Sequence, residues 1–486
     1  MSRSADARQT GNTQSEHQGS TKQSGNSAGQ AARSGAPALA GVLRAAARDS
    51  KLRGLVHHIG EPSLAIQGPD AALPFAVGTI AQHAPVLLVT ATGRQAEDLS
   101  IQLRDMLGDT VELMPAWETL PHEKLSPSIE VMSQRMKVAR RLHLQAAMAS
   151  GSAGGADAAD AASGDAAAPG ENQRPLKVVI APVRTLVQPI QDVLGTVAPV
   201  HLAVDEDIEL AGEPGDFDGL QHKLVELGYS NVDVVGRRGH FAVRGGILDI
   251  FPATAELPVR VEFWGDEVSE IRPFSVGDQR TIPGIELPDV TVYPARELMI
   301  TDSVAERAEA LARENAGNAE LADVYEKISQ RIAVPGMESL ISQLHDGELK
   351  LLPQLMPDKT HTIVVAPATV ERRASDLKET GEQFLEAGWE AAAMGADAPA
   401  EGVAYVTVAA AKKAQQNLKR PWWTISPLGM ADSDEGFDGD ALLLDYESAP
   451  QPRGDMDAIE KMMDDIRRRV ESGGRVAYAA PVSYTH

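Results

Sequence analysis

The chain of 486 residues contains no cysteine. This absence excludes a disulfide scaffold, a thiol nucleophile and thiolate ligands for a metal, and it fits a reducing cytoplasm. The sequence also lacks an apolar run of membrane-spanning length, and its N-terminus has no apolar signal-peptide core. We therefore expect a cytoplasmic protein without a membrane partner.

The sequence contains fewer positively charged than negatively charged residues. The 45 Lys and Arg residues stand against 69 Asp and Glu residues, which gives a formal net charge of −24. Because phosphate contacts need clustered Lys and Arg, general nucleic-acid binding is disfavoured. The length allows several domains, each large enough for its own core.

Intact catalytic motifs are missing as well. The sequence has no HExxH, and a GxSxG spacing occurs only at 25–29 (GNSAG), within the polar N-terminal stretch and not between an expected strand and helix, so we predict neither a catalytic nor a metal site. A phosphate-binding loop would belong after the first predicted strand, at Gln67, Gly68, Pro69 and Asp70. A working loop ends in Lys and Ser or Thr, and both are absent here, while Asp70 would repel phosphate. These four residues predict an inactive, degenerate nucleotide loop.

Strands and helices are expected to alternate in the first part of the chain, which predicts a parallel sheet covered by helices. Residues 1–40 are too polar to form a core and predict a disordered tail, and residues 146–170 predict a low-complexity insertion. The expected strands are 63–67, 86–90, 111–114 and 178–181, and the expected helices are 71–82, 94–107 and 183–194.

The pattern changes near residue 200. Four expected strands, with a hairpin turn at Gly265-Asp266, predict an antiparallel domain with one helix. The strands are 241–244, 247–251, 259–264 and 268–274, and the helix is 219–227. Further on, we expect helices over 303–344, 369–387 and 456–471 and strands at 362–366, 441–445 and 475–480. The chain stops directly after the last of these strands, so we expect a truncated protein.

The strand at 259–264 carries the most informative side chains. Its alternation buries Val259, Val261 and Phe263 and exposes Arg260 and Trp264 on the opposite face. Arg244 lies just before Gly245-Gly246 and joins this patch if the strands are neighbours. Arg and Trp often anchor protein interfaces. The alternative is that Trp264 packs on a neighbouring domain and the arginines form surface ion pairs of little energetic value.

The motifs FAVRGGILDIFP, PVRVEFWGDEVSEIRPF and QRT closely resemble the N-terminal module of the bacterial transcription-repair coupling factors. That module is itself similar to part of the excision-repair protein UvrB. Matching stretches also occur at 115–128 (PAWETLPHEKLSPS), 134–140 and 178–187 (VVIAPVRTLV). The resemblance spans roughly residues 42–352 and is weak beyond about residue 402.

The resemblance implies an α/β fold, in which a UvrB-like, helicase-type parallel domain is split in sequence around a smaller, mostly antiparallel α+β domain. The halves would be 41–199 and 293–400, the antiparallel domain 200–292, and 401–486 a partial third α/β domain. The antiparallel domain would bind UvrA, the damage-recognition ATPase, through Arg244, Arg260 and Trp264. The family often has Phe at the position of Trp264.

For the function, the resemblance implies a repair factor that recruits UvrA and links removal of stalled RNA polymerase to nucleotide excision repair. This chain would need no cofactor and would not be catalytic. ATP and magnesium would serve a double-stranded DNA translocase downstream, so RNA polymerase and DNA are partners of the longer protein. The alternative is an ATP-hydrolysing, UvrB-like excision-repair helicase.

Overall fold

A computed structural model describes residues 37–120, 123–150, 174–210, 212–345, 347–393, 404–427, 441–446 and 456–473. The expected tail lies mostly outside these residues, as does the strand expected at 475–480. Residues 146–150 belong to helix α5 (Ile129–Ser150), so the start of the expected insertion is helical. Among the described helices, none combines the length and the apolar composition that a membrane-spanning segment requires.

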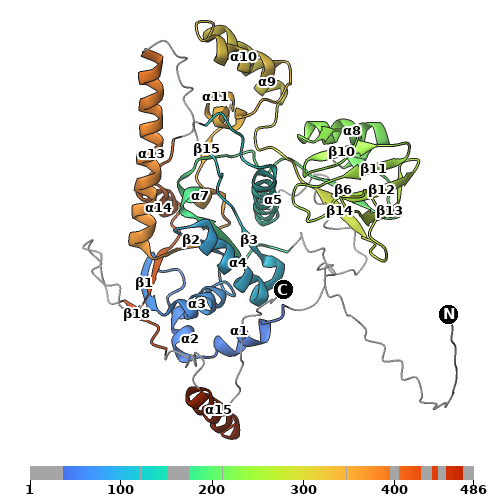
Figure 1. Ribbon diagram of the computed structural model, residues 1–486. Coiled ribbons are helices and arrows are strands. Elements are labelled where there is room, and N and C mark those ends of the chain that lie inside the picture. The colour runs from blue at the N-terminus through green and yellow to red at the C-terminus, as the bar shows by residue number, and fades with distance from the viewer. Residues whose placement is uncertain are drawn as a thin grey trace, which may run out of the picture. The chain divides into compact units, whose positions relative to one another are not determined.

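A parallel sheet of seven strands forms the larger core (Figure 1). Its order is β18-β1-β17-β16-β2-β4-β3, and every pair is parallel. All residues of β2, β4 and β16 are buried, as expected for inner strands covered on both faces. The bounds are β1 (Ser63–Gly68), β2 (Val86–Thr90), β3 (Val111–Leu113), β4 (Val178–Pro182), β16 (His361–Val365), β17 (Trp422–Pro427) and β18 (Leu442–Leu443).

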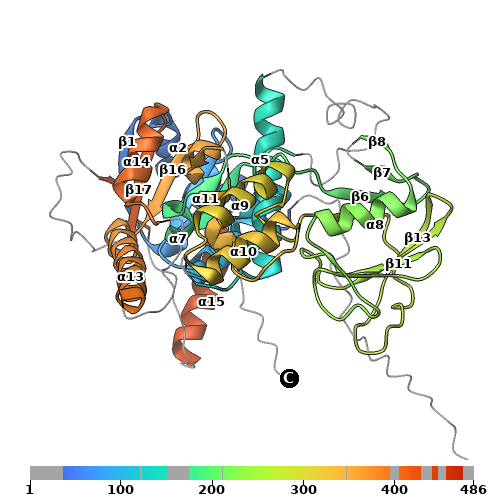
Figure 2. The ribbon, with the colours of Figure 1, turned by 90° about the horizontal axis from the view of Figure 1, so that it is seen from above.

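Helices cover both faces of this sheet (Figures 1 and 2). In β2, Leu87 and Val89 pack into one apolar cluster, while Val86 and Leu88 pack into another on the opposite face. The first cluster includes side chains of α5, α7 (Val183–Val187), α12 (Leu352–Leu355), α13 (Pro367–Ala393) and α14 (Val408–Asn417). The second includes side chains of α2 (Ser50–His57), α3 (Leu73–Ile80) and α4 (Gly93–Leu107), and α1 (Ala40–Ala46) contacts α3 and α4.

Two expectations for this region are wrong. The described strands after residue 401 do not start a third domain, because β17 lies between β1 and β16 and β18 pairs with β1. Trp423 of β17 is fully buried in the core of the sheet. The helix expected at 183–194 ends at Val187, because Pro189 disfavours helical geometry at Gln188, and the chain enters β5 (Ile190–Gln191).

The antiparallel domain has its own sheet and core. The sheet order is β13-β12-β11-β10-β9, and α8 (Phe217–Glu226) lies along one face of it (Figure 2). The hairpin expected at Gly265-Asp266 is confirmed, and Gly265 adopts a φ of +70° that favours glycine. The strands are β9 (Ser230–Asn231), β10 (His240–Val243), β11 (Ile247–Ile250), β12 (Val259–Trp264) and β13 (Glu267–Pro273).

The remaining elements are short strand pairs and helices. The helices α9 (Asp302–Glu314), α10 (Ala319–Ser329) and α11 (Ile341–Leu344) share an apolar cluster with Trp117. None of the side chains of α15 (Met456–Glu471) is buried. The pairs are β6 (Val200–Ala203) with β14 (Asp289–Val292), β7 (Glu209–Leu210) with β8 (Glu213–Pro214), and β5 with β15 (Leu349–Lys350).

Candidate docking surface on the antiparallel domain

Strand β12 has the predicted alternation. Val259, Val261 and Phe263 are buried and belong to the core that α8 covers. Arg260 is partly exposed and Trp264 is exposed, on the opposite face of the sheet. We call the part of this face that carries Arg244, Arg260 and Trp264 the docking surface.

The side chain of Trp264 exposes 84 % of its full accessible area. The hairpin turn that follows Trp264 is nevertheless held in place through Asp266. The backbone N–H of Phe217 donates to Asp266 Oδ1 (3.1 Å), and the N–H of Ile208 donates to the Asp266 carbonyl oxygen (3.0 Å). Because the Trp264 side chain is 84 % exposed, the alternative in which it packs on a neighbouring domain is wrong for the described part of the chain.

Arg260 differs from a free surface cation. Its Nε and Nη2 donate to Oδ1 and Oδ2 of Asp249 at 2.6 and 2.8 Å. The side chains of Arg260 and Asp249 are 20 % and 4 % exposed, and the guanidinium lies 5.3 Å from the Phe274 ring centroid. The hydrogen bonds to Asp249 raise the pKa of Arg260, against the opposing effect of partial burial. Arg260 thus forms an ion pair, but a largely buried one and not the surface pair of the alternative. Sequence analysis missed Asp249 and Phe274.

Arg244 stands at the corner of the hairpin between β10 and β11. Its backbone N–H donates to the carbonyl oxygen of Ile247 (2.9 Å), and its Nη2 donates to the carbonyl oxygen of Asp233 (2.7 Å). Gly246 allows a close backbone approach, since a Cβ at this position would lie 3.0 Å from the carbonyl oxygen of Phe263. The Arg244 side chain is exposed.

Strand register brings the three residues to one face without direct contact. Ile247, which faces Arg244 across the turn, pairs with Glu262, and Glu262 lies two residues from both Arg260 and Trp264. With about 3.3 Å per residue along a strand and about 4.8 Å between strands, the three Cα atoms lie about 12–13 Å apart. They are separate anchors on a broad surface rather than the lining of a pocket.

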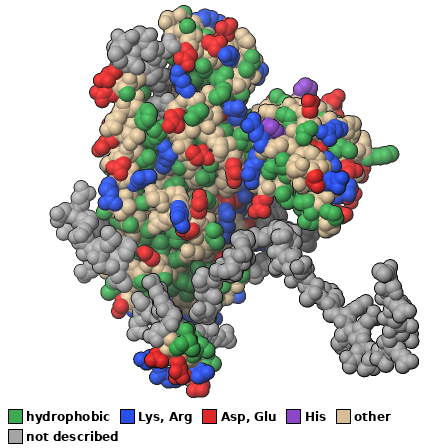
Figure 3. Space-filling model, in the orientation of Figure 1, with side chains coloured by type: hydrophobic (Ala, Val, Ile, Leu, Met, Phe, Trp, Pro, Cys, Tyr) green, Lys and Arg blue, Asp and Glu red, His purple; other side chains and the backbone are tan. Residues whose placement is uncertain are grey.

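The space between the anchors holds paired charges. Arg272 Nη2 lies 2.9 Å from a carboxylate oxygen of Glu262 and 2.6 Å from one of Glu270. Figure 3 shows side chains of both charge signs interspersed over the visible face of this domain. Partly exposed pairs of this kind contribute little stability, and they can exchange partners when another protein docks.

The degenerate nucleotide loop does not fit a phosphate. Pro69 alone separates β1 from a short 3₁₀ helix that begins at Asp70, and proline has no N–H to donate. Leu444 covers the same strand end, because its N–H donates to the Gln67 carbonyl oxygen (2.6 Å) and its Cβ would lie 2.9 Å from a Cβ on Gly68. Within the described ranges, no three His, Cys, Asp or Glu side chains could hold a metal ion together.

Titration of the chain with ATP and Mg²⁺ is expected to give no saturable heat, because the loop has neither the Lys nor the Ser or Thr that would bind phosphate and magnesium, and Asp70 would repel phosphate. Isothermal titration calorimetry measures this, with a protein that has an intact phosphate-binding loop as positive control. Saturable binding that Asp70→Arg strengthens would contradict the expectation and support the helicase alternative.

Two of the motifs that carried the resemblance, at 115–128 and 134–140, contribute to a buried polar network around Glu297. Arg135 of α5 and Glu297 are 0 % and 3 % exposed, with Nε and Oε1 2.5 Å apart. The indole N–H of Trp117 donates to the same Oε1 (2.8 Å), and Arg135 Nη1 donates to the carbonyl oxygen of Pro115 (2.9 Å). These motif residues therefore stabilise the fold.

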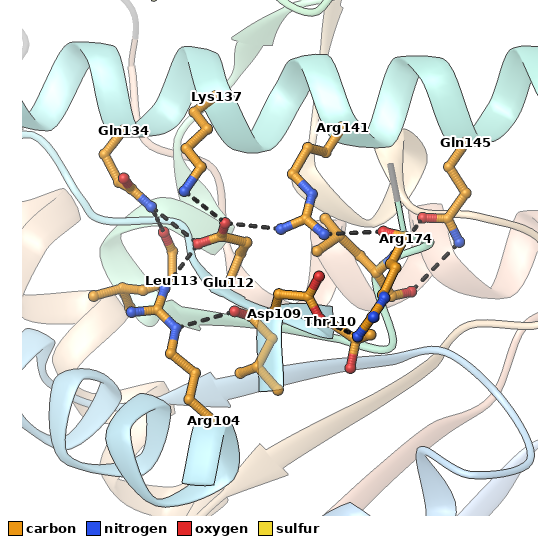
Figure 4. A network of polar contacts seen from close by, with 12 residues as sticks. Arg104, Asp109, Thr110, Glu112, Leu113, Gln134, Lys137, Arg141, Gln145 and Arg174 are labelled. Carbon is orange, nitrogen blue, oxygen red and sulfur yellow. Dashed lines mark hydrogen bonds and ion pairs between the residues drawn. The ribbon is translucent and has the colours of Figure 1, made fainter. Parts of the chain in front are cut away.

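A second network surrounds Glu112 of β3 (Figure 4). Lys137, Arg104 and Arg141 place side-chain nitrogens 2.7–2.9 Å from its carboxylate oxygens. Burial acts to raise the pKa of Glu112, but the three cations outweigh it and hold the pKa below its ordinary value. The carboxylate joins β3, α4 and α5.

Comparison with known proteins agrees with this geometry. The family described as UvrB interaction domain matches residues 210–298. A transcription-repair-coupling factor of Mycobacterium tuberculosis (strain CDC 1551 / Oshkosh) is 39% identical over 458 residues, which are 91% of this chain and 34% of the relative. Over 91% of its length, the chain is thus similar to transcription-repair-coupling factors, and it contains a match to the UvrB interaction domain.

More distant coupling factors match shorter parts. That of Escherichia coli (strain K12) is 30% identical over 249 residues, which are 51% of this chain and 18% of the relative. That of Bacillus subtilis (strain 168) is 27% identical over 322 residues, 62% of this chain and 24% of the relative. The chain spans about a third of the length of the mycobacterial coupling factors. The UvrB interaction domain contains the whole docking surface, including Asp249 and Phe274.

Proposed function

We propose that this chain recruits UvrA through the docking surface, and that the coupling factor thereby links removal of stalled RNA polymerase to nucleotide excision repair. One observation carries the proposal: within the UvrB interaction domain, Trp264 is 84 % exposed on a hairpin whose backbone is held in place. A large apolar side chain exposed on a rigid support loses little conformational entropy when a partner covers it.

The three anchors have different roles in this proposal. Trp264 supplies apolar area, since burying a Trp side chain removes about 150–250 Å² from water. Arg244 and Arg260 supply planar N–H donors for oxygen atoms of UvrA. RNA polymerase, double-stranded DNA, ATP and magnesium belong to this proposal as partners of the longer coupling factor, which acts in the cytoplasm. The family name and the UvrB interaction domain support this assignment.

The test is calorimetric titration of UvrA with the chain and with Trp264→Ala. The substitution is expected to raise the dissociation constant about 10- to 100-fold, as for a central interface anchor. Because the side chain is exposed, the unfolding midpoint should stay unchanged.

The matched control is Trp389→Ala, which removes a Trp that is 50 % exposed on α13, outside the UvrB interaction domain. Its affinity for UvrA should equal that of the unaltered chain. Equal affinities for Trp264→Ala and Trp389→Ala would show that the proposed surface does not bind UvrA.

A further inference from the structure

We infer that Asp249 and Phe274 are positioning residues that turn Arg260 into a directional hydrogen-bond donor for a carbonyl oxygen of the partner. This inference rests on the proposed binding of UvrA. It assigns the charge attraction of the docking surface to Arg244 instead of Arg260.

The pairing of β11 with β12 places Asp249 beside Arg260. The two residues are direct partners in the antiparallel ladder, so their side chains leave the sheet on the same face. Two parallel N–H···O bonds, of 2.6 and 2.8 Å, hold the guanidinium edge formed by Nε and Nη2. Such a bidentate pair fixes the plane of the guanidinium as well as its position.

The ring of Phe274 forms a second contact that fixes the Arg260 guanidinium. Phe274 is fully buried, its ring centroid lies 5.3 Å from the Arg260 guanidinium carbon, and its backbone N–H donates to the Pro258 carbonyl oxygen (2.9 Å). Gln279 joins the loop after Phe274 to the segment at Val235, because its side-chain amide donates to the carbonyl oxygens of Val235 (3.1 Å) and Val276 (2.8 Å). Phe274 and the loop that follows it are therefore themselves held in place.

One nitrogen of Arg260 remains for recognition. Among the described residues, Nη1 has no hydrogen-bond partner, and it is not among the buried unpaired polar atoms. Arg272, the neighbour of Arg260 on β13, pairs with Glu262 and Glu270 and does not compete for Asp249. Nη1 thus offers its two hydrogens to a partner in a fixed direction.

The net charge of the Arg260–Asp249 pair determines which kind of partner oxygen can accept a hydrogen bond from Nη1. Arg260 and Asp249 together carry no net charge, so a second carboxylate would find little attraction after losing its water. A neutral carbonyl oxygen loses less on desolvation and still accepts the bond. Arg244 is exposed, and the partner that the described residues give it is the neutral Asp233 carbonyl, so it keeps its charge toward the solvent.

The experiment is a double-mutant cycle for UvrA binding with Asp249→Asn, Arg260→Ala and the double variant. Asp249→Asn is expected to weaken binding about 5- to 20-fold in the unaltered chain and to have no further effect beside Arg260→Ala. Arg260→Lys should lose as much affinity as Arg260→Ala, because an ammonium cannot make the bidentate pair. An equal effect of Asp249→Asn in both backgrounds, or full affinity of Arg260→Lys, would overturn the inference.

Ionic strength tests the assigned charges independently. Between about 0.1 M and about 0.5 M salt, the fold-loss from Arg244→Ala should shrink and that from Arg260→Ala should stay constant. A salt-dependent loss for Arg260→Ala would show that Arg260 acts as a charge. If Trp264→Ala and Arg260→Ala both leave affinity unchanged, the proposed function itself fails; if they weaken it without coupling to Asp249, this inference alone fails.

Discussion

Replacing Glu297 by glutamine is expected to lower the free energy of unfolding by about 3–5 kcal/mol. The substitution removes the carboxylate that faces Arg135, which has no solvent exposure, and leaves its positive charge buried without a counter-charge. It also replaces one carboxylate oxygen by an amide NH₂ group, next to an Oε1 atom that accepts hydrogen bonds from both Arg135 and Trp117. The effect should be large because the guanidinium cannot turn into water.

Urea unfolding measures this effect, followed by the fluorescence of the five tryptophans, one of which, Trp117, donates its indole N–H to Glu297. The control is Glu309→Gln, which breaks the pair with Arg313 in which both side chains are more than half exposed. That change should be below about 1 kcal/mol. Similar small losses for both variants would contradict the stabilising role given to the buried pair.

Replacing Glu112 by glutamine is expected to lower the free energy of unfolding at pH 7 by about 2–4 kcal/mol. The three cations around it would repel one another without the carboxylate, although Arg104 and Lys137 are partly exposed and can reach water. Arg141 is 4 % exposed and cannot. The expected loss is therefore smaller than for a fully enclosed pair.

The pH dependence of this loss has a defined sign. The folded-state pKa of Glu112 lies below the ordinary value of 4.5, so its contribution is complete above that value and is lost as pH falls through the folded pKa. The difference between the two proteins should be constant from pH 7 to about pH 5 and shrink at lower pH. Urea unfolding over this range, with Glu309→Gln as the exposed control, tests it. A difference that grows on acidification would contradict the assignment.

Local patterns predicted most of the elements. The expected strands 86–90 and 259–264 and the expected helix 456–471 have the bounds of β2, β12 and α15. These segments have a clear apolar period or continuous apolar runs, and both signals are local. The error at 183–194 was also local, because the extended geometry of Gln188 follows from Pro189.

Parallel pairing was not predictable in the same way. β17 inserts between β1 and β16, although more than 350 residues separate it from β1. A short apolar strand carries no signal for its neighbours, so residues after 401 looked like a separate domain. The family motifs did not help there, since the resemblance is weak beyond about residue 402.

For the candidate site, the sequence by itself determined which side chains face outward. The two-residue period of a strand placed Arg260 and Trp264 opposite the core, and the motifs identified the family and the partner to be tested. The distance of the anchors from one another depends on strand register, and register comes from pairing between segments.

Only the tertiary structure decided what surrounds each anchor. It showed that Trp264 remains uncovered in the described part of the chain, while Arg260 is held by Asp249 from the next strand and by Phe274 from a loop. Exposure and ion pairing depend on contacts between residues distant in sequence, whereas strand periodicity depends on neighbours. For that reason the sequence identified the anchors and the fold determined their chemistry.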